Sequence, residues 1–260
     1  MATRPRSQVS ATVGDPIRSL LPWTGIALVA ACAADAHSTA HVGVAIGTLQ
    51  VELEGVASDA AQSTLVEAAF EFMPQSKVGG GIRGRGMASD DDLDANSGDG
   101  LPGTMRASEG DWFFHATFDS ATGVNRLPFR MGLSARNLDL EDSVSGNAYS
   151  FASFGPRIEF APIVPLITRE TLTISASGMV GFGYGFAKIE DSAAGTESEA
   201  NAGFTDLGLG IRASFGKGFG ELGYRYQSST YEQGDAVLGT TLGEVDATFS
   251  GVLLTLGLRF

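Results

Sequence analysis

Long apolar runs, basic residues and cysteine are all scarce in this chain of 260 residues. A membrane-spanning helix needs about 20 consecutive apolar residues, and the longest candidate, residues 20–34, already contains Pro22 and Thr24. Lys and Arg number 17 against 30 Asp and Glu, which gives a formal net charge of −13. A charge of this sign opposes binding to polyanions. The sequence therefore argues against a helical membrane protein and against a nucleic-acid-binding protein.

The only cysteine, Cys32, lies in a segment typical of an export signal. Arginines at positions 4, 6 and 18 precede a short apolar region at 26–31, and Ala34-Asp35-Ala36 fits the small-x-small pattern of signal cleavage. We predict a signal peptide over residues 1–36 and a cysteine-free domain over 37–260, which suits an oxidising compartment. Residues 29–32 also match a lipoprotein box, so acylation of Cys32 is the alternative to cleavage after Ala36.

Beyond residue 40 the dominant pattern is alternation of apolar and polar side chains, the period of a strand with two different faces. It is clearest over 172–186, where Leu172, Ile174 and Val180 share a face and Ser, Thr and Gly fill most of the other. Many of the segments exceed the five or six residues of an average globular strand, and a tilted strand across a bilayer needs about 9–11. The predicted strands are 41–54, 62–73, 77–88, 107–118, 127–139, 149–160, 170–189, 203–215, 218–232 and 245–260.

The connections between these strands favour a barrel. With the amino terminus in the periplasm, the inner turns fall at 74–76, 119–126, 161–169 and 216–217. The outer loops fall at 55–61, 89–106, 140–148, 190–202 and 233–244, and they are mostly longer and more acidic, as in bacterial outer-membrane barrels. We predict an all-β fold, a transmembrane antiparallel up-and-down β-barrel of about ten strands, with eight to twelve as the range. It would lie in the bacterial outer membrane with lipid and lipopolysaccharide as its partners.

Charged side chains alternate onto the face opposite the apolar one. An isolated charge facing lipid costs roughly 2–4 kcal/mol at the bilayer midplane, so we predict that these side chains face the lumen, together with Glu54 and Asp111. Both a hydrated lumen and one cross-linked by ion pairs agree with this pattern. The predicted pore-lining residues are Glu52, Glu67, Glu71, Arg83, Arg85, His115, Arg130, Arg136, Arg157, Glu159, Arg212, Glu221 and Arg225.

The final segment, residues 251–260, alternates Val252, Leu254, Leu256 and Leu258 and ends on Phe260. An aromatic residue at the end of such a strand resembles the signal that the barrel-assembly machinery recognises in outer-membrane proteins. We therefore expect that machinery to be a partner and Phe260 to be part of the assembly signal.

Four longer motifs carry a family resemblance. They are LPFRMGLSARNLDLE at 127–141, YSFASFGPRIEFAP at 149–162, LTISASGMVGFGYGF at 172–186 and DLGLGIRASFGKGFGELGYRYQ at 206–227. Phe-Gly-Pro-Arg at 154–157 is the most specific element. Over residues 127–260 the chain resembles the Legionella-type pore-forming major outer-membrane proteins, and this resemblance implies a pore-forming barrel.

Signals for cofactors and metals are weak. Residues 79–84 match G-x-G-x-x-G and residues 208–213 match its alanine variant, but dinucleotide binding needs that motif between a strand and a helix. We expect no cofactor. The acidic run with Asp90, Asp92 and Asp94 offers oxygen ligands for calcium, yet it departs from the EF-hand pattern, and a solvated loop is the simpler interpretation.

These patterns lead to a function hypothesis with two alternatives. The first is a porin-like barrel that passes ions or small solutes and is not an enzyme, with a mild cation preference set by its acidic loops. The first alternative is a closed barrel that serves as a membrane anchor, adhesin or envelope-structural protein, because eight strands are filled by side chains whereas 16–18 leave a channel. A hydrolase centred on His115 is the second alternative.

Overall fold

The computed structural model describes residues 38–53, 56–72, 78–89, 103–119, 126–142, 148–192, 195–233 and 244–260. The predicted signal peptide at 1–36 with Cys32, the predicted lumen residue Glu54, and the acidic run Asp90, Asp92 and Asp94 lie outside these ranges. No helix in the described ranges is long and apolar enough to cross a membrane.

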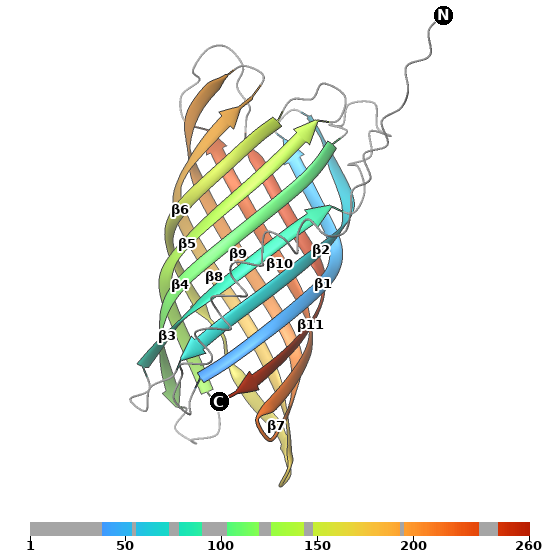
Figure 1. Cartoon of the computed structure of the whole chain (residues 1–260), viewed down its shortest axis with the longest axis vertical. Helices are drawn as coiled ribbons and strands as arrows, with labels where there is room; N and C mark the ends of the chain where they lie inside the picture. Colours follow the sequence, from blue (N-terminus) through green and yellow to red (C-terminus); the bar gives the residue numbers. More distant parts are fainter. Residues whose placement is uncertain are drawn as a thin grey trace, which may run out of the picture.

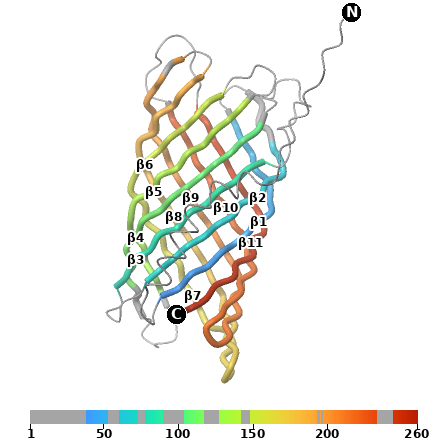
Figure 2. The backbone as a smooth tube through the Cα atoms, in the orientation of Figure 1, coloured from blue at the N-terminus to red at the C-terminus, as the bar shows by residue number. Residues whose placement is uncertain are grey.

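The described residues form one closed antiparallel β-sheet (Figure 1). The sheet closes because β1 pairs with β11 along its whole length, from Thr39↔Arg259 to Leu53↔Val245. Figure 2 shows these first and last strands, blue and red, running side by side. The strands are β1 (Ser38–Leu53), β2 (Val56–Phe72), β3 (Val78–Ser89), β4 (Gly103–Asp119), β5 (Arg126–Asp142), β6 (Ala148–Phe160), β7 (Ile163–Thr168), β8 (Leu172–Asp191), β9 (Thr196–Phe215), β10 (Gly218–Gln233) and β11 (Val245–Arg259).

Strands β6 and β7 act as one wall strand, so the eleven strands make a ten-stranded barrel, as predicted. Both pair with β8, and the break between them lies at Ala161 and Pro162. Proline has no backbone N–H to give to the ladder, and the Pro162 carbonyl instead accepts a hydrogen bond of 2.9 Å from the Gly178 N–H. An even number of strands returns the chain to its starting end, where the Phe260 N–H donates to the Ser38 carbonyl at 2.8 Å.

Three predicted connections are wrong in extent. The predicted inner turn at 161–169 contains β7, and the predicted outer loops at 55–61 and 190–202 are mostly strand, because β2 begins at Val56 and β9 at Thr196. The first part of β9 shows little apolar–polar alternation in its sequence. Its outward residues include Glu197 and Glu199, but its inward residues, Ala200 and Ala202, are too small to give a clear hydrophobic pattern. Turn 216–217 is as predicted, with Gly216 in the left-handed region at φ 54°.

The outer surface of the barrel has two zones. The half nearest the chain ends carries an exposed apolar belt on the face opposite the lumen charges, as the alternation of apolar and charged side chains predicts. The half nearest the outer loops carries a polar wall. Members of the apolar belt include Val42, Val44, Ile46, Phe114, Met131, Leu133, Ile158, Leu207, Leu209, Ile211, Leu222, Tyr224, Val252, Leu254 and Leu256. The exposed residues of the polar wall are Gln50, Glu52, Gln62, Arg106, Asp139, Glu141, Lys188, Glu190, Glu197, Glu199 and Glu232.

The interior is layered in the opposite order. Behind the apolar belt it is charged, and behind the polar wall it is a hydrophobic core in which Phe151 and Tyr231 pack with their ring centroids 5.0 Å apart. The outer half of the barrel therefore has the polarity of a water-soluble protein, and the inner half has the polarity of a membrane barrel. The larger side chains of this apolar core are Leu49, Val51, Leu65, Met105, Leu138, Leu140, Phe151, Ile189, Phe204, Tyr231, Val245, Phe249 and Leu253.

Candidate functional site

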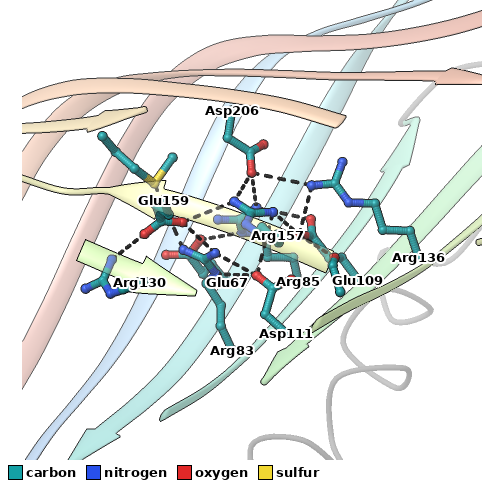
Figure 3. A network of polar contacts seen from close by, with 12 residues as sticks. Glu67, Arg83, Arg85, Glu109, Asp111, Arg130, Arg136, Arg157, Glu159 and Asp206 are labelled. Carbon is teal, nitrogen blue, oxygen red and sulfur yellow. Dashed lines mark hydrogen bonds and ion pairs between the residues drawn. The ribbon is translucent and has the colours of Figure 1, made fainter. Parts of the chain in front are cut away.

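The candidate site is a group of charged side chains that project into the lumen at the level of the apolar belt (Figure 3). Its side chains are at most 15% exposed. We call it the lumen network. Its six guanidinium groups are Arg83, Arg85, Arg130, Arg136, Arg157 and Arg225, and its six carboxylates are Glu67, Glu71, Glu109, Asp111, Glu159 and Asp206.

Strand register brings these residues together. Inward positions on neighbouring strands lie opposite each other, so Glu67 of β2 faces Arg85 of β3, and Arg83 faces Asp111 of β4. Arg85 Nε donates to Glu67 Oε2 at 2.6 Å, and Arg83 Nη2 donates to Asp111 Oδ2 at 2.6 Å. Cross-strand pairs of opposite charge stabilise a sheet.

Longer contacts cross the barrel and join its walls. Glu159 of β6 accepts from Arg83 Nη2 at 2.7 Å, from Arg157 Nη2 at 3.1 Å and from Arg130. Glu67 accepts from Arg225 Nη2 of β10 at 2.9 Å. The Arg83–Glu159 bond joins β3 to β6 and the Glu67–Arg225 bond joins β2 to β10. Neither pair of strands is adjacent in the sheet, so these bonds brace the barrel across its lumen.

Two further acceptors, Glu109 and Asp206, serve three arginines each. Glu109 accepts from Arg157 Nη1 at 2.6 Å, from Arg136 Nη2 at 3.0 Å and from Arg85 Nη1 at 3.1 Å. Asp206 Oδ2 accepts from Arg85 at 3.2 Å, from Arg136 at 3.4 Å and from Arg157. Six positive and six negative groups make the network neutral, and buried charges are tolerated only when they are paired and hydrogen-bonded.

Glu109 and Asp206 were not among the predicted lumen residues. The signal was present: Glu109 stands two residues before Asp111, and Asp206 stands six residues before Arg212, so each shares a strand face with a predicted lumen residue. Met179, the one large apolar side chain on the polar face of 171–185, also lies inward. Its sulfur accepts from Arg225 Nη1 at 2.8 Å.

Two predicted lumen residues lie outside the network as a separate pair. Arg212 Nη2 and Glu221 Oε2 are 2.6 Å apart, with side chains 20% and 17% exposed. Arg212 also lies over the Phe219 ring at 4.4 Å from its centroid. This pair faces the lumen nearer the inner turns, as expected for residues close to turn 216–217.

The prediction that Glu52 lines the lumen is wrong. Leu49 and Val51 point inward and are buried, so Glu52 alternates onto the outer face and is exposed. Both faces of β1 carry apolar residues, because the lower part packs against lipid from outside and the upper part packs in the core. The sequence of β1 alone therefore gives no contrast that fixes the face of Glu52.

His115 is inside the barrel, as predicted, and is 2% exposed. Neither ring nitrogen has a hydrogen-bond partner among the described residues. No group of three or more His, Cys, Asp and Glu side chains in those residues is arranged to hold a metal ion. The buried part of the lumen thus contains mainly paired charges, with the imidazole of His115 beside them.

Side chains fill most of the described lumen. Within the network a cavity of about 10 Å³ lies beside Arg83, Arg130 and Glu159. A second cavity of about 50 Å³ lies between the network and the apolar core. Spaces of this size hold a few water molecules at most.

Comparison with solved structures finds outer-membrane proteins at low sequence identity. The outer membrane protease OmpT of Escherichia coli matches with a TM-score of 0.52 and 9% identity, over 86% of this chain and 97% of that chain. The translocator domain of the autotransporter NalP from Neisseria meningitidis gives a TM-score of 0.40 at 9% identity, over 95% and 98%. Ail, the attachment invasion locus protein of Yersinia pestis, gives 0.28 at 11%, over 86% and 99%. No family model and no curated protein matches the sequence.

The likeness to OmpT, the closed sheet and the apolar belt together decide the fold. This chain is an outer-membrane β-barrel. A closed sheet leaves no unpaired strand edge in hydrocarbon, which is why strands cross membranes only as barrels. The barrel therefore belongs to the bacterial outer membrane, with the apolar belt in lipid. At 9% identity, the likeness to a protease concerns the fold alone.

Proposed function

We propose that this outer-membrane barrel is closed and works as a membrane anchor that presents its polar wall and outer loops at the cell surface, as an adhesin or envelope-structural protein does. The observation that carries this proposal is the filled interior. The lumen network occupies the membrane half and the apolar core occupies the outer half. A solute crossing the barrel would have to displace both layers.

The projecting half supports the same proposal. Its outward side chains are polar and mainly acidic, and its interior is apolar, so it is stable in water without lipid around it. As an anchor, it lifts the outer loops clear of the lipid surface.

A pore is the second candidate, and the resemblance of residues 127–260 to the Legionella-type pore-forming proteins favours it. In that case the lumen network would have to rearrange to admit water, and the acidic loops would favour cations. We propose no catalytic role for His115, because its buried ring is out of reach of a substrate at the surface.

Single-channel conductance in a planar bilayer separates the two candidates. Protein purified from outer membranes and shown to be folded by its heat-dependent gel mobility should give no stable conductance steps. The double variant Arg157→Ala with Glu159→Ala removes two crossing groups and should give small steps. Stable steps from the unaltered protein, shifted by the single variant Arg130→Ala, would establish the porin function instead.

A further inference from the structure

A chamber lies inside the barrel where the lumen network meets the apolar core. It has a volume of about 50 Å³. Arg85, Glu109 and Arg136 lie on its charged side, and Leu138 and Phe249 lie on its apolar side. The chamber thus lies between a layer of arginine and glutamate side chains and a layer of hydrocarbon side chains.

Three residues that line the chamber have an N–H group to spare. Arg85 Nη2, Arg136 Nε and Gln227 Nε2 are buried and have no hydrogen-bond partner among the described residues. Their side chains are well enclosed, since the three residues are 3%, 8% and 9% exposed. Buried donors are normally paired, so three on residues that line one chamber point to a ligand that accepts hydrogen bonds.

The chamber offers no carboxylate oxygen in return. Both oxygens of Glu109 already accept from arginines. Among the described residues, the buried carboxylate oxygens that lack a partner belong to Asp111 and Asp206, which do not line the chamber. The Ser229 hydroxyl accepts from Arg136 Nη1 at 3.0 Å. Donors therefore outnumber free acceptors there.

We propose that this chamber binds a small monovalent inorganic anion of the halide class. A halide accepts several hydrogen bonds and donates none, which matches the surplus of donors. A water molecule would bring two hydrogens that need acceptors of their own. The apolar side suits a weakly hydrated ion such as chloride or bromide. The anion bridges β3, β5 and β10, and thereby ties the charged layer to the apolar one.

Anomalous diffraction tests the proposal directly. Crystals of the protein prepared throughout in sodium bromide should give an anomalous bromine peak in the chamber, within hydrogen-bonding distance of the three nitrogen atoms. A map with only water-like density there, and no anomalous peak, would overturn the proposal. This measurement uses the unaltered protein, so it does not depend on any variant folding.

The dependence of the melting temperature on bromide, measured with and without the substitution Gln227→Glu, is a second test. The carboxylate of this variant places acceptor oxygens in the chamber and takes the role of the anion. The unaltered protein should melt about 2 °C or more higher in bromide than in equimolar gluconate, and Gln227→Glu should lose that difference. Gln62→Glu, on the polar wall, is the matched control and should keep it. An equal bromide effect in all three proteins would mean a general salt effect and contradict the anion site.

Discussion

At the residue scale, the stability of the barrel depends on how charges are shared in the lumen network. Glu159 accepts from Arg83, Arg157 and Arg130 in a region closed to water. Breaking a buried ion pair by removing one partner typically costs about 3–5 kcal/mol, because the remaining charge is left buried and uncompensated. The same removal at the surface has little effect.

We therefore expect Glu159→Gln to lower the free energy of unfolding by about 3–5 kcal/mol, since three guanidinium groups would share one negative charge less. Glu190→Gln is the matched control, because Glu190 lies on the polar wall and its pair with Lys188 is exposed. Urea unfolding in lipid vesicles, followed by heat-dependent gel mobility, measures both. Equal stability of the two variants would contradict the bracing role of the network.

Sequence patterns predicted most of this network, for a physical reason. Successive side chains of a strand point to opposite faces, and a charge that faces lipid is very costly. Alternation along the strand therefore predicts that charged residues such as Arg83, Arg85 and Arg157 point inward. Alternation does not predict the face of Glu52, because β1 is apolar on both faces. Alternation also does not predict which charged residues form pairs. The contacts of Asp206 with Arg85 and Arg136 join strands that are not neighbours, and no spacing in the sequence encodes them.

At the scale of the strands, closure depends on the seam between β1 and β11. Gly47 and Gly251 lie opposite each other there. A Cβ at Gly251 would lie 2.6 Å from the Ile46 carbonyl oxygen, closer than van der Waals contact allows. The backbones of β1 and β11 therefore leave no room for a side chain at either position.

Gly251→Ala should therefore overpack the seam and lower the free energy of unfolding by about 1–3 kcal/mol. The folded fraction after insertion into vesicles should fall accordingly. Gly203→Ala makes the same chemical change in β9, where an added Cβ would meet nothing within 4 Å. Heat-dependent gel mobility gives the folded fraction of each. A loss in Gly203→Ala as large as in Gly251→Ala would mean that glycine acts here only through strand propensity.

Several strands, such as β2, β4 and β9, are longer than their sequence patterns predicted, and the reason lies in the solvent around them. Within the membrane, lipid on one side and charges on the other impose strong alternation. Above the membrane, β9 has Glu197 and Glu199 outside and small alanines inside, so the contrast weakens. Strand β7 was missed because Pro165 interrupts it and its last residues are exposed.

At the scale of the whole molecule, the barrel is two filled half-barrels of opposite polarity stacked end to end. This arrangement sets its position in the membrane, because only the apolar belt can contact hydrocarbon. It also accounts for the proposed closed state, since each half has an interior matched to its own surroundings.

Tryptophan quenching by brominated lipid tests this arrangement most directly. In a background with Trp23→Phe and Trp112→Phe, Leu209→Trp places the single probe in the apolar belt and Glu199→Trp places it on the polar wall, both outward on β9. We predict strong quenching of the probe at position 209 by lipid brominated along its acyl chains, and none at position 199, which aqueous iodide should quench instead. Lipid quenching of both probes would contradict the account, since it would put the polar wall inside the membrane.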